Sequence, residues 1–124
     1  MEQQVSIWCI DAAGEPIKRT VDALVIGGLA VHSAAGIKTS DGAPSYSITH
    51  IASGKRASPL YFESKETAQK VAEILTLLPV DWSACQFDDP YARQHLALAI
   101  KAISALFGGY LVDHAIDEPA AGSA

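Results

Sequence analysis

Residues 45–83 decide the fold of this chain and read SYSITHIASGKRASPLYFESKETAQKVAEILTLLPVDWS. Residues 45–52 alternate with a period of two, with Tyr46, Ile48 and His50 on one face, which predicts a strand. The next residues, Ser53-Gly54-Lys55-Arg56, predict a turn. Residues 60–62 then predict a short strand that pairs back on the first.

A helix follows this predicted hairpin. Ser64 is a typical N-cap, whose hydroxyl accepts from a backbone N–H two or three residues further on, and Glu66 suits the first turn of a helix. Apolar residues then recur at intervals of three and four, which predicts one face packed on a sheet: Ala68, Val71, Ala72, Leu75 and Leu78. Pro79 ends the predicted helix, and Trp82 is expected to cover the end of the core.

The preceding part of the chain is typical of strands. Residues 5–10 and 17–21 alternate around turn residues and predict a hairpin. Residues 24–26 and 29–32 are also strand-like, and Gly27-Gly28 between them is either a tight hairpin turn or a bulge in one strand; we favour two short strands. Residues 34–44 contain Gly, Pro, Ser and Asp and predict a loop.

The end of the chain predicts a second helix. Asp88-Asp89 supplies a cap, Pro90 the first helical position and Gly108-Gly109 the end, so the helix is expected over residues 90–107. It is apolar on most of its circumference, which predicts a homo-oligomer formed through this helix. Residues 113–124 are acidic and then small, and are expected to be frayed.

The order of elements, strands first and helices last, is typical of an α+β fold. We expect an antiparallel sheet of about five strands, followed by two C-terminal helices packed on one face. Residues 1–112 are expected to form a single domain, because a chain of 124 residues buries a sizeable core on its own.

Composition narrows the function. Hydrophobic residues make up 49% of the chain against 19% charged, which favours a packed globule over disorder. The net charge of −5 and the scattered basic residues argue against a duplex nucleic acid as partner. The chain shows no span suited to a membrane and no secretory signal at its start, so a cytoplasmic protein is expected.

Known catalytic and metal motifs are not matched. Gly36-Ile37-Lys38-Thr39 has some letters of a phosphate loop without their spacing, and Cys9 and Cys85 lack the spacing of a zinc site, so no cofactor and no metal are expected. His32 and His50 lie on neighbouring predicted strands, as in two-histidine phosphoesterases, although the hydroxyl residue of that motif is misplaced or missing. A small phosphodiesterase that uses this pair stays open as an alternative.

The residues that remain favour recognition. Aromatic rings stack on bases, and Lys and Arg pair with phosphates. Residues of these types on or beside the strand–turn–strand unit are Tyr46, His50, Lys55, Arg56, Tyr61 and Trp82. Arg93 and Lys101 are eight residues apart on the last helix and therefore project from nearly one face. They either line a pocket between subunits or serve as solubilising charges.

Three motifs carry a resemblance to a known family: I-T-H-I-x-S-G over residues 48–54, S-K-E-T-A over residues 64–68, and D-W-S over residues 81–83. Together with the layout of a sheet followed by two helices, they resemble small phage proteins, the Thoeris anti-defence sponges. The resemblance implies a protein that binds cyclic ADP-ribose-type immune signals between subunits and does not cleave them. The site residues named above are inferred from this chain, and none is carried over from the family.

The sequence thus leads to a hypothesis of a non-enzymatic, phage-type protein in the host cytoplasm. It would sequester a nucleotide immune signal, either cyclic ADP-ribose-like or a cyclic oligonucleotide, at subunit interfaces and so inhibit host anti-phage defence. The alternative is a small inhibitor that docks on a host protein through its apolar C-terminal helix.

Overall fold

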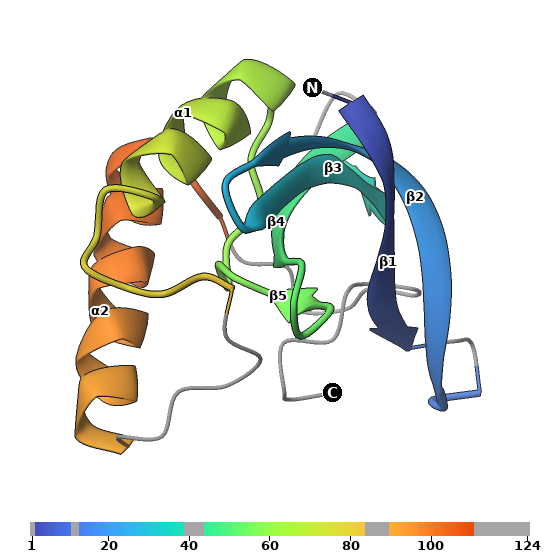
Figure 1. The fold of residues 1–124 in the computed structure, drawn as a ribbon. Helices are drawn as coiled ribbons and strands as arrows, with labels where there is room; N and C mark the ends of the chain where they lie inside the picture. Colours follow the sequence, from blue (N-terminus) through green and yellow to red (C-terminus); the bar gives the residue numbers. More distant parts are fainter. Residues whose placement is uncertain (1, 11–12, 39–43, 84–89, 111–124) are drawn as a thin grey trace.

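The computed structural model describes residues 2–10, 13–38, 44–83 and 90–110 (Figure 1). The elements in chain order are β1 (Glu2–Ile10), β2 (Pro16–Ile26), β3 (Leu29–Lys38), β4 (Pro44–His50), β5 (Lys55–Arg56), α1 (Lys65–Leu75) and α2 (Pro90–Leu106). The expected α+β class, a five-stranded antiparallel sheet followed by two C-terminal helices, is confirmed. In Figure 1 both helices lie on the same side of the sheet.

The strands follow one another across the sheet in the order β1-β2-β3-β4-β5, and every neighbouring pair is antiparallel. The sheet curls strongly (Figure 1), so that its first strand returns to the region before β5. There the Trp8 backbone N–H donates to the Gly54 carbonyl at an N–O distance of 2.8 Å. This bond links the two edges of the sheet, which would otherwise present unpaired backbone groups.

Two predicted boundaries in the first half are wrong. Gly27-Gly28 is a tight turn between two strands, as favoured, and Gly27 has a positive φ of 58°. The preceding strand, however, is continuous from Pro16 to Ile26, because residues 16–24 pair with β1 and residues 24–26 pair with β3. The predicted loop at residues 34–44 is also shortened: β3 continues to Lys38 through a register shift, and residues 39–43 lie outside the described part.

The predicted hairpin after β4 is displaced. β5 consists of Lys55 and Arg56, which the sequence assigned to a turn, and it pairs with Thr49 and His50. The predicted strand at residues 60–62 makes only isolated bridges, from Phe62 to Tyr46 and from Tyr61 to Tyr110. The turn occupies residues 51–54, two residues earlier than predicted, and Gly54, with φ of 73°, closes it.

Helix α1 forms as its sequence predicts. The Ser64 hydroxyl accepts from the Thr67 backbone N–H, and four residues of the predicted apolar stripe are buried: Ala68, Val71, Ala72 and Leu75. The helix ends at Leu75, four residues before Pro79. It packs over β2, β3 and β4, where Leu29, Val31 and Ile48 complete the main core.

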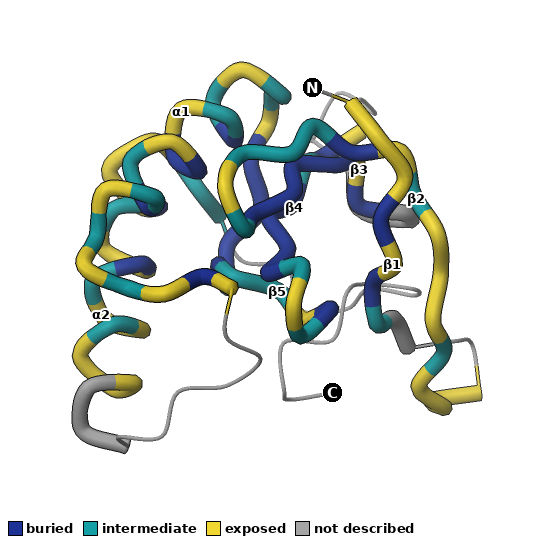
Figure 2. Tube along the Cα trace, in the orientation of Figure 1, coloured by how far each residue is buried: buried dark blue, intermediate teal, exposed yellow. Residues whose placement is uncertain are grey.

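A second core lies on the other face of the sheet. Val5, Ile7, Ala23 and Ala30 form it, enclosed by the curl of the sheet (Figure 2). This face continues along β3 and β4 as a row of buried polar residues. There the His32 Nε2 lies 2.7 Å from the Thr49 hydroxyl, and the His32 Nδ1 donates to the Ser33 carbonyl at 2.9 Å. The imidazole is thus held neutral, with Nε2 accepting from Thr49.

Trp82 joins three parts of the fold. Its indole N–H donates to the Leu75 carbonyl at the end of α1 at 3.0 Å, and its own carbonyl accepts from the His50 Nε2 at 2.7 Å. Gly28, in the turn between β2 and β3, approaches it so closely that a Cβ there would lie 2.7 Å from Trp82 atoms. Trp82 is 7% exposed, so the expectation that it covers the core is confirmed.

Helix α2 is attached mainly through its second half. Ile100 is buried in the main core, and the buried Ser104 hydroxyl lies 2.7 Å from that of Ser58. Beyond the helix, Gly109 donates to the Ser104 carbonyl at 2.9 Å. The first half, from Arg93 to Ala99, is mostly exposed (Figure 2). The predicted cap at Asp88-Asp89 and the predicted frayed tail lie outside the described residues.

Neither of the two described helices is long and apolar enough to cross a membrane.

We predict that Gly54→Ala destabilises the fold more than Gly14→Ala does. Both positions have a positive φ, 73° and 83°, so alanine is strained at each. Only at Gly54 would the new Cβ also meet a neighbour, Trp8 Cδ1 at 2.9 Å. Urea denaturation should show an additional loss of about 1 kcal/mol or more for Gly54→Ala. Equal losses in the two variants would show that the contact with Trp8 is unimportant.

We also predict an acid-labile fold that depends on His32. Burial lowers the pKa of His32 below its ordinary value. The unfolded chain therefore binds the proton more readily than the folded protein, and stability is highest above about pH 6.5 and falls as the pH drops below it.

Urea denaturation at a series of pH values from about 8 to about 5 measures how steeply the free energy of unfolding falls with pH. His32→Gln removes this titrating group and should make stability depend less on pH over that range. An unaltered slope in His32→Gln would contradict the assignment.

Candidate functional site

A pocket of about 550 Å3 lies between helix α2 and the segment that begins at β5, and three of the four predicted cationic residues line it. We call it the α2 pocket. Three cations line it: Arg56, Arg93 and Lys101. The rest of its wall is mainly apolar, with Ala57, Pro59, Leu96 and Leu98.

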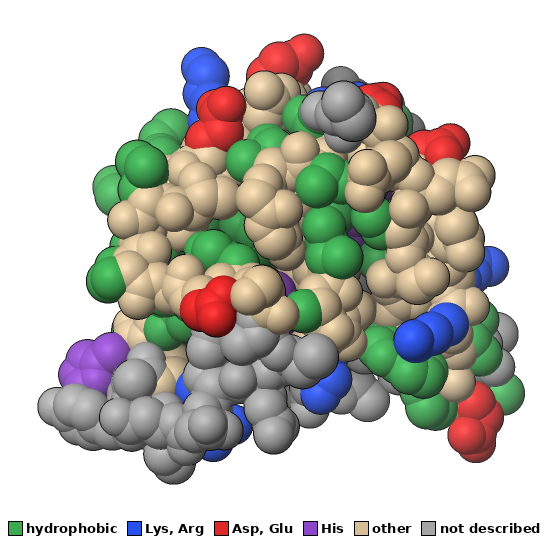
Figure 3. All heavy atoms as spheres, in the orientation of Figure 1, with side chains coloured by type: hydrophobic (Ala, Val, Ile, Leu, Met, Phe, Trp, Pro, Cys, Tyr) green, Lys and Arg blue, Asp and Glu red, His purple; other side chains and the backbone are tan. Residues whose placement is uncertain are grey.

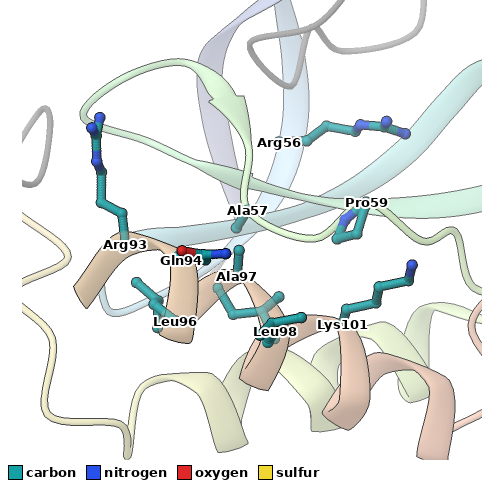
Figure 4. Close-up of a pocket in the computed structure, with 10 residues that line it drawn as sticks. Arg56, Ala57, Pro59, Arg93, Gln94, Leu96, Ala97, Leu98 and Lys101 are labelled. Carbon is teal, nitrogen blue, oxygen red and sulfur yellow. The ribbon is translucent and has the colours of Figure 1, made fainter. Parts of the chain in front are cut away.

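Helix geometry places two of these cations in a row. Arg93 and Lys101 are eight residues apart, so their backbones are separated by roughly 12 Å along the axis. Figure 4 shows Arg93 at one end, Lys101 further along the helix, and Arg56 on the facing chain. Both α2 cations are exposed, and among the described residues neither forms an ion pair with a carboxylate.

Arg56 is held differently from the other two cations. On β5 it faces Thr49 across the strand pair, and its guanidinium lies over the Tyr61 ring at 4.7 Å from the ring centroid. The residue is only partly exposed. A guanidinium that is stacked on a ring is oriented in advance, which lowers the entropy cost of binding an anion. In Figure 4 the Arg56 side chain extends away from α2, so Arg56 borders the pocket with its guanidinium held on Tyr61, and Arg93 and Lys101 are the cations that project from the helix.

The other predicted ligand-binding residues do not line this pocket. Lys55 is exposed but projects from the opposite face of β5, as its pairing with His50 requires. Tyr46 is partly buried and packs against the main core. Two aromatic residues proposed for stacking on a base are largely buried, Tyr61 at 1% exposed and Trp82 at 7%. In this structure they offer a ligand little ring surface.

His50 is also buried and has structural partners. Its Nε2 donates to the Trp82 carbonyl at 2.7 Å, and its Nδ1 lies 2.9 Å from the Ser53 hydroxyl. Both ring nitrogens are therefore committed to holding the turn and the Trp82 corner. We do not include His50 in the candidate site.

The strand register separates the two histidines of the phosphodiesterase alternative. His32 pairs with Ser47, whereas His50 pairs with Leu29, three residues before His32 on the same strand. Side chains alternate between faces along a strand, so residues three apart project from opposite faces. His32 and His50 therefore lie on opposite sides of the sheet and do not converge on one substrate.

Metal ligands do not converge in the part of the chain that the structure describes, where no group of three His, Cys, Asp or Glu could hold an ion. Cys85 and the side chain of Cys9 lie outside that part.

The sequence analysis missed the apolar half of the pocket. Helical spacing predicts that Arg93 and Lys101 lie on one face of α2. Ala97, halfway between them, is a small side chain on the same face and leaves room beside them. No local signal shows that the segment around Pro59 would come to lie opposite it. That placement depends on Ser58 and Ser104, which are far apart in the sequence.

Comparison of this chain with protein-family models, with curated proteins and with solved structures found no match.

Proposed function

We propose that this protein binds a small phosphate-bearing ligand in the α2 pocket and holds it without converting it. The observation that carries the proposal is that Arg93 and Lys101, both exposed on α2, line one mainly apolar pocket that Arg56 also borders. A cavity of about 550 Å3 has the size of sites that enclose small organic molecules. Guanidinium and ammonium groups pair with phosphate, and the apolar wall suits a ring system.

The ligand class that we propose is a nucleotide immune signal, either cyclic ADP-ribose-like or a cyclic oligonucleotide. This part of the proposal is supported by the resemblance to the Thoeris anti-defence sponges. In that role the protein would act in the host cytoplasm and lower the concentration of the free signal. Binding without turnover fits the two buried histidines, whose ring nitrogens are bonded within the fold.

We further propose that the protein is a homo-oligomer assembled through α2. Three large apolar residues are exposed on or directly after this helix: Leu98 at 62%, Leu106 at 82% and Phe107 at 38%. Figure 3 shows hydrophobic side chains at the surface over the helical side of the molecule. Leu98 also lines the α2 pocket, so a second subunit on this surface would cover the bound ligand.

The second candidate function uses the same apolar residues. A small inhibitor could dock this surface of α2 on a host protein instead of on another copy of itself. Leu98, Leu106 and Phe107 favour it as they favour the oligomer, because exposed apolar clusters are typical of protein interfaces. The two candidates differ in one respect: only the first requires a small-molecule ligand.

We predict that the double substitution Arg93→Glu and Lys101→Glu abolishes ligand binding and leaves the fold intact. Native mass spectrometry with cyclic ADP-ribose isomers and cyclic dinucleotides should show wild-type protein carrying intact ligand. Each charge-assisted contact that is lost costs about 1.5–3 kcal/mol, so affinity should fall by at least about 100-fold.

Lys70→Glu makes a matched charge reversal at an exposed position on α1 and should bind normally. Unchanged affinity in the double variant would remove Arg93 and Lys101 from the site. Recovery of a cleaved ligand would contradict a non-enzymatic role.

We predict that Leu98→Glu combined with Leu106→Glu dissociates the oligomer, because the two charges would be buried in the interface. Sedimentation velocity of the wild-type protein and of the double variant measures the change in oligomeric state. Leu77→Glu is the control, since Leu77 is likewise 82% exposed but follows α1 and is not part of α2. If the wild-type protein is a monomer and still binds nucleotide, the proposed oligomer is wrong but the proposed ligand site stands. If it is a monomer and binds no nucleotide, docking on a host protein is favoured.

A further inference from the structure

A second pocket lies beside the first. It has a volume of about 450 Å3 and is formed by the corner that follows α1 and by the first half of α2. Three of its lining residues are polar: Asp81, Arg93 and His95. The others are apolar, among them Val80 and Leu96. We call it the Asp81 pocket.

The two pockets share Arg93 and Leu96. Leu96 packs against the main core, so it marks the line along which α2 is attached. Arg93 is exposed at the end of that line and borders both cavities. A phosphate held by Arg93 would therefore have one pocket on either side of it.

Asp81 gives its pocket a hydrogen-bond acceptor of fixed orientation. Its Oδ1 accepts from the Ser83 backbone N–H at 3.0 Å and from the Ser83 hydroxyl. These bonds hold the pKa of Asp81 below its ordinary value, so the carboxylate is charged at neutral pH. The second oxygen, Oδ2, accepts no hydrogen bond from the residues that the structure describes. Among the described residues no donor competes with a ligand for this oxygen.

A carboxylate and a guanidinium in one mainly apolar pocket select a particular chemistry. The carboxylate repels phosphate and accepts hydrogen bonds from neutral donors, whereas the guanidinium binds phosphate. A sugar whose hydroxyls lie next to a phosphate supplies both partners. Dinucleotide-binding proteins use this logic when an acidic side chain accepts from the ribose 2′-hydroxyl.

We propose that the Asp81 pocket binds the ribose of the ligand, with its 2′-hydroxyl donating to Asp81 while Arg93 holds the adjoining phosphate. This inference rests on the proposed function and makes it more specific. The protein selects ribonucleotides over 2′-deoxyribonucleotides, and the ligand extends from the Asp81 pocket past Arg93 into the α2 pocket.

The test compares ADP with 2′-deoxy-ADP by isothermal titration calorimetry. Wild-type protein should bind ADP roughly 10- to 100-fold more tightly, which is the effect of one hydrogen bond to a charged group. Asp81→Ala should bring the two affinities together by weakening only ADP. Asp81→Asn keeps an oxygen that accepts from the Ser83 N–H, so the corner is preserved, but the negative charge is lost. The preference for ADP over 2′-deoxy-ADP should therefore fall several-fold.

Glu73→Gln removes a carboxylate from an exposed position on α1 and should retain the full preference. Three results would overturn the inference: equal affinities in wild-type protein, a preference that persists in Asp81→Ala, or no binding of either nucleotide. If the two affinities are equal and yet both fall in the Arg93 and Lys101 double variant, the proposed function stands and only the ribose assignment fails. If neither nucleotide binds and the immune-signal panel also gives no complex, both fail.

Discussion

The structure depends on the corner at Trp82. Its indole satisfies the last carbonyl of α1, its backbone carbonyl takes the His50 N–H, and its backbone packs on Gly28. The corner thus fixes the end of the helix, the end of β4 and the turn between β2 and β3 with one residue. Helix ends leave carbonyl groups short of partners, and here the indole joins the Leu78 backbone N–H, which donates to the same Leu75 carbonyl at 3.1 Å.

The same corner determines how α2 is placed. The chain leaves Trp82 at one end of the core, and the buried attachments of α2, Ile100 and Ser104, lie in its second half. Its first half is therefore held against the body along a narrow line at Leu96, with a cavity on each side. If the first half of α2 were packed closely on the body of the protein, its cations would be either buried in the contact or directed away from the apolar walls. This partly detached helix keeps Arg93 and Lys101 exposed beside apolar walls.

Local signals in the sequence were sufficient for α1, whose Ser64 cap and apolar spacing are contained within its own residues. Pairing was less predictable, because it depends on distant partners. Lys55 and Arg56 form β5 since the Gly54 turn aligns them with β4, and β3 passes its expected end since small residues there still pair with β4. Burial of Tyr61 was missed, and Trp82 was assigned to a ligand site as well as to the core, because an amphipathic ring suits a core as well as a binding surface.

Charge explains why a site of this kind suits a small ligand. The chain carries a net charge of −5, yet three of its nine Lys and Arg line one pocket. At physiological ionic strength a charge is screened over about 8 Å, so a ligand inside the pocket experiences mainly those three cations. A duplex extends many phosphates well beyond that distance, over a surface that is acidic on balance. The arrangement of charge therefore favours a small ligand whose one or two phosphates lie within the pocket.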